Sequence, residues 1–220
     1  MRLRKKSWTD DFLEVNKEYL ITWDKTAKVD FAREFKNNFP VYLEIGCGKG
    51  TFITQHALLN PTFNFIGMEK EKTVTGVALK KTLATFGKTP LFNLKYFNNF
   101  AEDLSQMFSD DSVDQIFLNF SDPWPKSRHA KKRLTYIEFL NMYSKILKEN
   151  GELHFKTDND GLFESTLENL KLTNKWEIIS QTTDLYNEQT LLQNNIATEY
   201  ETKFHNLGKN INKLILRNKK

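Results

Sequence analysis

The residues best suited to chemistry lie in one stretch, 118–134, which reads LNFSDPWPKSRHAKKRL. It joins an apolar run to a proline-rich acidic loop and then to a basic segment. Pro123 and Pro125 fix their own φ angles and restrict the residue before each, so we expect Asp122 and Trp124 to be extended. The loop then presents the Asp122 carboxylate with little conformational entropy left to lose. We expect Trp124 to pack beneath the loop; stacking on a base is the alternative role.

The basic segment that follows is a candidate track for the phosphates of a nucleic acid, because cations spaced along a loop can contact successive phosphates. A solvated surface face is the alternative interpretation of such a run. Its members are Lys126, Arg128, His129, Lys131, Lys132 and Arg133. The stretch therefore sets a rigid carboxylate beside a cationic patch.

A second candidate site is the glycine-rich sequence EIGCGKG at 44–50, which ends a short apolar run. Glycines permit positive φ and let a ligand touch the backbone, and the N-terminus of a following helix offers N–H groups to an anion. Glu69 lies nineteen residues beyond Gly50, where a carboxylate can accept hydrogen bonds from ribose hydroxyls. These features predict a site for a nucleoside-bearing cofactor; a plain strand-to-helix turn is the alternative.

Two details favour S-adenosylmethionine over a dinucleotide, although the motif alone leaves both open. The spacing is G-x-G-x-G, and Glu44 stands two residues before the first glycine, Gly46. A carboxylate there repels a pyrophosphate and attracts the ammonium of a methionine moiety. We interpret Cys47 as a packing residue and Lys49 as a solvent-facing one.

A third acidic position is Asp158, within the sequence TDND at 157–160. A short polar residue here can cap the N-terminus of the next helix, and Asn159 or Asp160 can do this in place of Asp158. A metal site formed by Asp158 and Asp160 is disfavoured, because no histidine is placed nearby. We therefore expect no metal.

Strands and helices that alternate from residue 41 onward must position these segments. The expected strands are 41–45, 64–68, 91–97, 113–120, 152–156, 176–182 and 210–216, and the expected helices are 51–59, 74–86, 101–108, 136–147 and 162–170, with 198–204 left uncertain. Such alternation predicts an α/β, Rossmann-like fold with a mostly parallel seven-stranded sheet, helices on both faces and right-handed crossovers. Residues that follow the strands should then meet at one edge of the sheet. We expect residues 1–38 to form a basic N-terminal arm with a short helix, ahead of one domain at 39–220.

Composition narrows the class of protein. Hydrophobic residues make up 39% of the 220 residues and charged residues 27%, which is typical of a folded chain. The single cysteine, Cys47, excludes an intramolecular disulfide framework and a multi-cysteine zinc site. With no signal-peptide pattern and no apolar run long enough to span a membrane, we expect a cytoplasmic protein. The net charge of +4 is a weak indication of an acidic partner.

Four motifs together resemble a known family. They are NFSDPWPKSRHAKKRL at 119–134, EIGCGKG at 44–50, HFKTDN at 154–159 and TEYETKF at 198–204. The chain is similar, over almost its full length, to the bacterial tRNA (guanine-N7-)-methyltransferases. The resemblance implies a class I methyltransferase fold, S-adenosylmethionine as the methyl donor, and methylation of a guanine in the variable loop of tRNA.

The resemblance also assigns residues to roles. On the cofactor side it places Glu44, Gly46, Gly48, Glu69 and Asp122, and on the substrate side Lys126, Asp158, Thr198, Glu199, Tyr200 and Glu201. It assigns contacts with RNA to Arg128, His129, Lys131, Lys132 and Arg133. One departure is that Phe100 precedes Ala101 where the family usually has an Asp, so we expect Asn98, Asn99 or Glu102 to replace that contact with the adenine amino group, and favour Asn99.

The implied chemistry depends on positioning, because guanine N7 carries a lone pair and no proton. We expect Asp122 to orient donor and base, and Asp158 and Glu201 to hold the guanine edge. No obligate protein partner is implied, and the chain is expected to act as a monomer or homodimer. A nicotinamide-dependent oxidoreductase and a catalytically silent RNA-binding module remain as alternatives.

Overall fold

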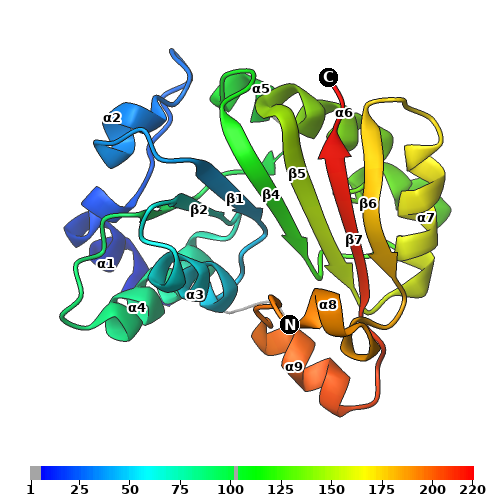
Figure 1. The fold of residues 1–220 in the computed structure, drawn as a ribbon. Helices are drawn as coiled ribbons and strands as arrows, with labels where there is room; N and C mark the ends of the chain where they lie inside the picture. Colours follow the sequence, from blue (N-terminus) through cyan, green and yellow to red (C-terminus); the bar gives the residue numbers. More distant parts are fainter. Residues whose placement is uncertain (1–5, 102–103) are drawn as a thin grey trace. The chain divides into compact units, whose positions relative to one another are not determined.

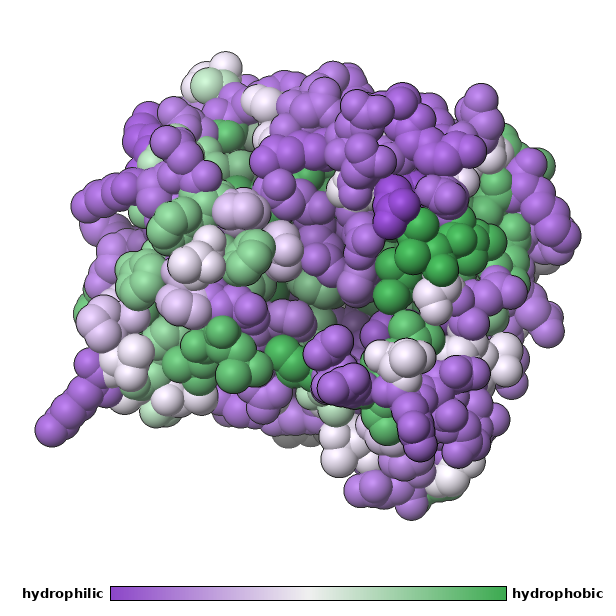
Figure 2. All heavy atoms as spheres, viewed as in Figure 1, coloured by the Kyte–Doolittle hydropathy of each residue, from purple (hydrophilic) through white to green (hydrophobic). Residues whose placement is uncertain are grey.

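The computed structural model describes residues 6–101 and 104–220, which fall into two compact units. The N-terminal unit comprises Met1–Ser109 and the C-terminal unit Asp110–Lys220. Each unit has β-strands with helices packed on them (Figure 1). No helix within these described residues is long and apolar enough to cross a membrane. Figure 2 shows hydrophilic side chains interspersed with hydrophobic patches on the visible face of both units.

The strands of the N-terminal unit are all parallel and run in the order β3 (Leu94–Phe97), β2 (Asn64–Met68) and β1 (Val41–Ile45). All five residues of β2 are buried, as expected for a strand covered on both faces. The helical segments of this unit are α1 (Thr9–Val15), η1 (Lys17–Tyr19), α2 (Phe31–Phe35), α3 (Thr51–Leu59), α4 (Lys72–Phe86) and α5 (Leu104–Met107). Of these, α3 contacts β2 and β3, and α4 contacts α3 and β3.

The described part of the predicted N-terminal arm packs on this unit. Helix α1 contacts α4, Leu20 forms a parallel bridge with Tyr96, and the Ile21 N–H donates to the Tyr96 carbonyl at 2.8 Å. Two α-helices and a 3-10 helix are found where one short helix was expected. The domain boundary at residue 38 stays a prediction; the two compact units divide between Ser109 and Asp110.

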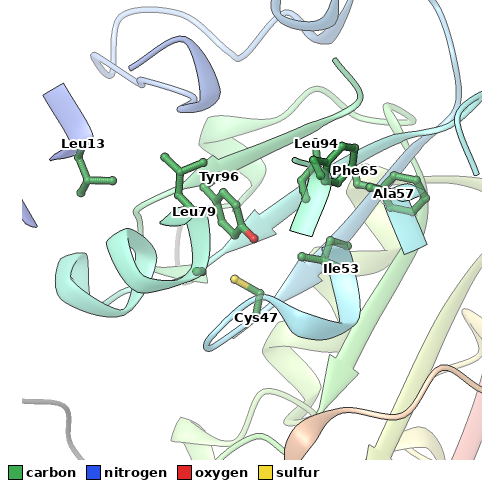
Figure 3. Close-up of a cluster of buried hydrophobic side chains, with 10 residues drawn as sticks. Leu13, Cys47, Ile53, Ala57, Phe65, Leu79, Leu94 and Tyr96 are labelled. Carbon is green, nitrogen blue, oxygen red and sulfur yellow. The ribbon is translucent and has the colours of Figure 1, made fainter. Parts of the chain in front are cut away.

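Tyr96 lies within the buried cluster of the N-terminal unit, where the Cys47 sulfur points toward it (Figure 3). Its hydroxyl and that of Thr82 share a hydrogen bond of 2.6 Å, and the hydroxyls of Thr82 and Thr54 share one of 2.7 Å. Burial raises the pKa of Tyr96 well above its ordinary value, so its hydroxyl stays protonated. This chain of neutral hydroxyls ties β3 to α4 and α3.

The C-terminal unit has four strands in the order β4 (Val113–Asn119), β5 (Leu147–Thr157), β7 (Asn212–Asn218) and β6 (Trp176–Thr182). Strands β4 and β5 are parallel, and β7 is antiparallel to both of its neighbours. The helical segments are η3 (Ser127–Lys132), α6 (Ile137–Ile146), α7 (Asp160–Leu170), η4 (Leu185–Asn187), α8 (Gln189–Leu192) and α9 (Glu199–Asn206). Helices α6 and α7 contact β5, and α8 and α9 lie where β5 ends and β7 begins (Figure 1).

The predicted elements are found with small differences in their bounds. The main difference concerns residues 148–151, which were expected to lie between a helix at 136–147 and a strand at 152–156. Asn150 and Gly151 instead lie inside β5, which starts directly after α6. Asn150 has a φ of 62°, and the pairing of β4 with β5 shifts register at this point, so the two residues form an irregularity in the strand. Asparagine tolerates this left-handed conformation better than most side chains.

Gly50 lies too close to Tyr96 to tolerate a side chain. It has a φ of +74°, and a Cβ there would lie 2.3 Å from the Tyr96 hydroxyl oxygen, which is held by its hydrogen bond to Thr82. Gly50→Ala should therefore lower the free energy of unfolding by about 3 kcal/mol through backbone strain and overpacking.

Urea denaturation measures this loss, with Gly208→Ala as the matched control. Gly208 has a similar φ of +79°, and nothing lies within 4 Å of its Cβ position, so only the strain term of about 1 kcal/mol applies. Equal losses in the two variants would contradict a steric role for Tyr96.

Candidate functional site

The predicted cofactor residues of the N-terminal unit follow the carboxyl ends of its strands. Glu44 lies near the end of β1 and is buried, and Glu69 follows β2 directly. The Glu69 carboxylate accepts a hydrogen bond from the Gly48 N–H at 3.2 Å and another from the Glu71 N–H at 3.0 Å. One acid therefore connects the glycine turn to the loop after β2.

The glycine turn leaves open space where a ligand can approach the backbone. Gly46 and Gly48 have φ values of +76° and +55°, and nothing lies within 4 Å of either Cβ position. The N–H groups of Gly46 and Cys47 donate to the Met68 carbonyl, which fixes the turn against β2. A turn of this kind, with carboxylates beside it, fits a cationic, ribose-bearing cofactor.

Cys47 is a buried packing residue, as predicted. Burial raises the pKa of its thiol well above the ordinary value, and the charges of Glu44 and Glu69 raise it further. The thiol is therefore protonated and poorly nucleophilic. Both carboxylates act on this one sulfur, so they lie close to the same turn.

The two asparagines that follow β3 make different contacts. Asn98 donates through its side-chain amide to the Glu69 carbonyl at 2.7 Å and to the Lys70 carbonyl at 3.1 Å, so it braces the loop after β2. Asn99 accepts from the Phe100 N–H at 2.8 Å. Phe100 is half exposed, and Glu102 lies outside the described residues. The preference for Asn99 as an adenine ligand stays a prediction.

The acidic loop of the C-terminal unit follows β4 and exposes Asp122. The expectation that Trp124 is extended was wrong, because its φ is +41°. Arg133 accounts for much of the loop's shape: its guanidinium donates to the carbonyls of Pro123 and Trp124 at 3.1 Å and to the Ser165 hydroxyl at 2.7 Å. These bonds tie the loop to α7 and offset the unfavourable conformation of Trp124.

The same bonds distinguish Arg133 from the rest of the basic segment. Arg133 turns inward, whereas the exposed cations are Lys126, Arg128, Lys131 and Lys132. Lys132 lies over the Trp124 ring at 4.8 Å from its centroid, and His129 meets that ring edge-on. The prediction that Arg133 contacts RNA stays a prediction, and the structure gives its guanidinium a structural role in the loop.

Asp158 follows β5 and is not the cap of the next helix. Asn159 caps α7, accepting the Leu162 N–H through its side chain at 2.8 Å. The Asp158 carboxylate instead accepts from the Tyr200 hydroxyl at 3.4 Å. Tyr200 is 43% exposed, and its ring packs on Phe120, with 5.0 Å between centroids, and stacks on Phe204, with 4.1 Å between centroids. A carboxylate and a partly exposed aromatic cluster are thus neighbours.

Helix α9 was left uncertain by the sequence. Thr198 and Glu201 form a capping box, in which the Thr198 hydroxyl accepts the Glu201 N–H and the Glu201 carboxylate accepts the Thr198 N–H. The T-x-x-E spacing at 198–201 is the signal that predicts such a helix start. Glu201 is fully buried and Glu199 exposed, so within this segment Glu199 and Tyr200 face solvent.

Sequence comparison finds a family described as a putative methyltransferase, whose pattern matches residues 38–214. The tRNA (guanine-N(7)-)-methyltransferase of Mesoplasma florum is 61% identical over 99% of this chain and 99% of its own. The protein of the same name from Mycoplasma mycoides subsp. mycoides is 61% identical over the whole of both chains. That from Staphylococcus carnosus is 42% identical over 96% of each.

Solved structures show the fold. The 16S rRNA methyltransferase KamB matches with a TM-score of 0.63 and 14% identity, covering 89% of this chain and 96% of its own. The phosphoethanolamine N-methyltransferase 2 of Haemonchus contortus, solved in complex with S-adenosyl-L-methionine, matches with a TM-score of 0.50 and 14% identity, over 96% of this chain and 53% of that one. The predicted α/β class, a Rossmann-like class I methyltransferase fold, is confirmed, with β7 as an antiparallel strand.

The stability of the folded chain should depend on pH through Lys213, a buried lysine. It lies on β7 directly opposite Lys156 of β5, and both side chains are buried. Burial, followed by the charge of Lys156, lowers the pKa of Lys213 to about 8. Between pH 8 and the ordinary lysine pKa near 10.4, the unfolded chain binds more protons at this site, so stability should rise with pH, by less than about 1.4 kcal/mol per pH unit.

Denaturation of the wild type and of Lys213→Met at several pH values tests this. The wild type should gain stability relative to the variant as pH rises from 8 to 10, because the introduced methionine side chain has no charge to lose. Lys219→Met, at an exposed position just beyond the same strand, should track the wild type. A constant difference between wild type and Lys213→Met would show that Lys213 titrates normally.

Proposed function

Since the chain belongs to the tRNA (guanine-N7-)-methyltransferase family, we propose that it transfers a methyl group from S-adenosylmethionine to N7 of a guanine in the tRNA variable loop. The observation that carries this proposal is the pairing of the Asp158 carboxylate with the exposed residue Tyr200, in the unit that also holds an exposed basic segment. A partly exposed aromatic cluster next to an acceptor for N–H groups fits guanine, and the basic segment fits the RNA that carries it.

The N-terminal unit holds the methyl donor in this proposal. Glu69 accepts hydrogen bonds from the ribose hydroxyls, and Glu44 attracts the methionine ammonium across the turn at Gly46 and Gly48. Asn99 contacts the adenine. When bound, S-adenosylmethionine supplies an activated methyl group: the lone pair of guanine N7 forms a bond to the methyl carbon, and the carbon–sulfur bond breaks with its electrons left on sulfur.

The C-terminal unit orients the guanine. The base packs against the exposed part of Tyr200, and the two oxygens of Asp158 accept N1–H and the exocyclic amine, which a carboxylate matches in geometry. Lys126 and Glu199, both exposed, contact the same nucleotide. Thr198 and Glu201 serve the site through the capping box that starts α9, because Glu201 is fully buried.

Asp122 is the catalytic residue of this proposal, although no proton has to leave N7. The ring becomes cationic as the new bond forms, and a fixed carboxylate stabilises that developing charge. Because Pro123 restricts Asp122, little reorganisation is needed when the reaction occurs. Asp122 thus aligns donor and base and acts as neither acid nor base.

Transfer of labelled methyl groups tests the function directly. The purified chain is incubated with labelled S-adenosylmethionine and a tRNA transcript, and the product is digested to nucleosides. We expect label in 7-methylguanosine, and none when the variable-loop guanine is replaced by 7-deazaguanine, which lacks N7. Binding of tRNA without any transfer would instead support a silent RNA-binding module in this family member.

Asp122→Asn should lower kcat by about 100-fold, since one preorganised charge at the reacting atoms is lost. Binding of tRNA should be unaltered. Asp110→Asn is the matched control, because Asp110 is exposed just before β4 while Asp122 follows it. Full turnover by Asp122→Asn with normal tRNA binding would exclude the catalytic role of Asp122.

The basic segment predicts a change in salt dependence. Arg128→Gln combined with Lys131→Gln should weaken tRNA binding and reduce the slope of log K against log salt by about 1.4 to 1.8, at 0.7 to 0.9 per phosphate contact. The control removes two exposed lysines just beyond the far end of α7, as Lys171→Gln with Lys175→Gln, and should leave the slope intact. A slope that stays the same in both variants would make the segment a solvated face.

A further inference from the structure

A buried ion pair supports the segment that carries the predicted substrate residues. Lys156 of β5 and Glu201 of α9 are 3% and 0% exposed, and their charged atoms are 2.5 Å apart. By comparison, the ion pair of Lys95 with Glu34 in the N-terminal unit leaves 17% of each side chain exposed. Lys156 cannot reach a large ligand such as RNA, so any effect it has on RNA must act through its neighbours.

The ammonium of Lys156 has three donors, and the structure gives it three acceptors. It donates to the side-chain oxygen of Asn195 at 3.0 Å, to the carbonyl of Ile196 at 3.0 Å, and to the Glu201 carboxylate. Glu201 in turn accepts from the Asn195 amide at 2.6 Å and from the Tyr186 hydroxyl at 3.4 Å. The directions of these bonds leave the pair one favoured arrangement.

Lys156 and Glu201 contact a backbone segment that has no regular secondary structure. Residues 195–198 connect α8 to α9 without helix or strand geometry, so side chains must define their path. Lys156 holds the first part of this connection, and Glu201 holds its end through the capping box with Thr198. Tyr200 lies one residue before Glu201, so its backbone position depends on this anchoring, while Phe120 and Phe204 pack on its ring.

Lys156 also belongs to the strand that leads to Asp158. The two residues are two positions apart at the end of β5, and Asp158 accepts from the Tyr200 hydroxyl. One strand end therefore carries both the carboxylate and the lysine that fixes the aromatic ring opposite it. Lys213, opposite Lys156 on β7, adds a contact with the Leu191 carbonyl at 3.3 Å, which secures the α8 end.

We propose that Lys156 is a positioning residue, which acts through Glu201, Asn195 and Ile196 to hold Tyr200 and Asp158 in the arrangement that binds the nucleotide. Apolar residues in place of both members of a buried ion pair often give equal or greater stability, so stability alone does not explain the pair, although loss of Lys156 alone leaves the buried Glu201 charge without its partner. The directional bonds of Lys156 define one path for the connection instead. The role in nucleotide binding rests on the proposed function. The anchoring of residues 195–201 rests only on contacts within the protein.

Lys156→Met tests the proposal by separating the two substrates. We expect kcat/KM for tRNA to fall by about 100-fold, the scale of a misplacement near 1 Å, while the Kd for S-adenosylmethionine stays unaltered. Lys95→Met, which removes a partly buried ion pair in the other unit, should leave kcat/KM for tRNA intact. A purely structural role would lower both affinities together with the folded fraction, and that result would overturn the proposal.

Hydrogen exchange in the free protein tests the anchoring without any substrate. Amides of residues 195–206 should exchange faster in Lys156→Met than in wild type, and those of β4 and β5 should not. Asn195→Ala, at a half-buried position outside the sheet, gives a milder second variant if Lys156→Met fails to fold, and should show the same local pattern. Unaltered exchange at 195–206 would overturn the anchoring, whereas a wild type without tRNA methylation would overturn only the proposed function.

Discussion

The close approach of backbone to Tyr96 is the constraint on which the N-terminal unit depends. A Cβ at Gly67 would lie 2.8 Å from the Tyr96 ring, and one at Gly50 would meet its hydroxyl, so β2 and the start of α3 come as near as glycine allows. The hydroxyl then finds its partner in Thr82 of α4. Glu69 follows β2, so the position of this acid, a proposed cofactor ligand, depends on the same packing.

Much of the fold follows from local sequence. The apolar run, glycine turn and amphipathic stretch at 41–59 predicted β1 and α3, and both have the expected bounds. Local patterns failed where the backbone takes a conformation that the residue type disfavours, as at Trp124, whose positive φ depends on the distant Arg133 and on Ser165 of α7. The two prolines next to Trp124 do not indicate that Arg133 and Ser165 fix the loop.

The site was predictable in composition but not in the direction of its side chains. A run of cations in a sequence does not show which of them turn inward, so Arg133 looked equivalent to Arg128 although its guanidinium bonds the loop. Glu201 likewise belongs to a motif with Tyr200, yet one is buried and the other exposed. The sequence did not indicate a role for Lys156, because its ion-pair partner, Glu201, lies forty-five residues away.

The strand order of the C-terminal unit bears on how the chain acquires its structure during synthesis. Strand β6 pairs within this unit with β7, which the ribosome makes later, and β7 inserts between β6 and β5. Until β7 has emerged, the facing edges of β5 and β6 both present unpaired backbone groups. The nascent chain thus passes through a stage in which these two edges are open to other chains, and the risk of aggregation is highest then.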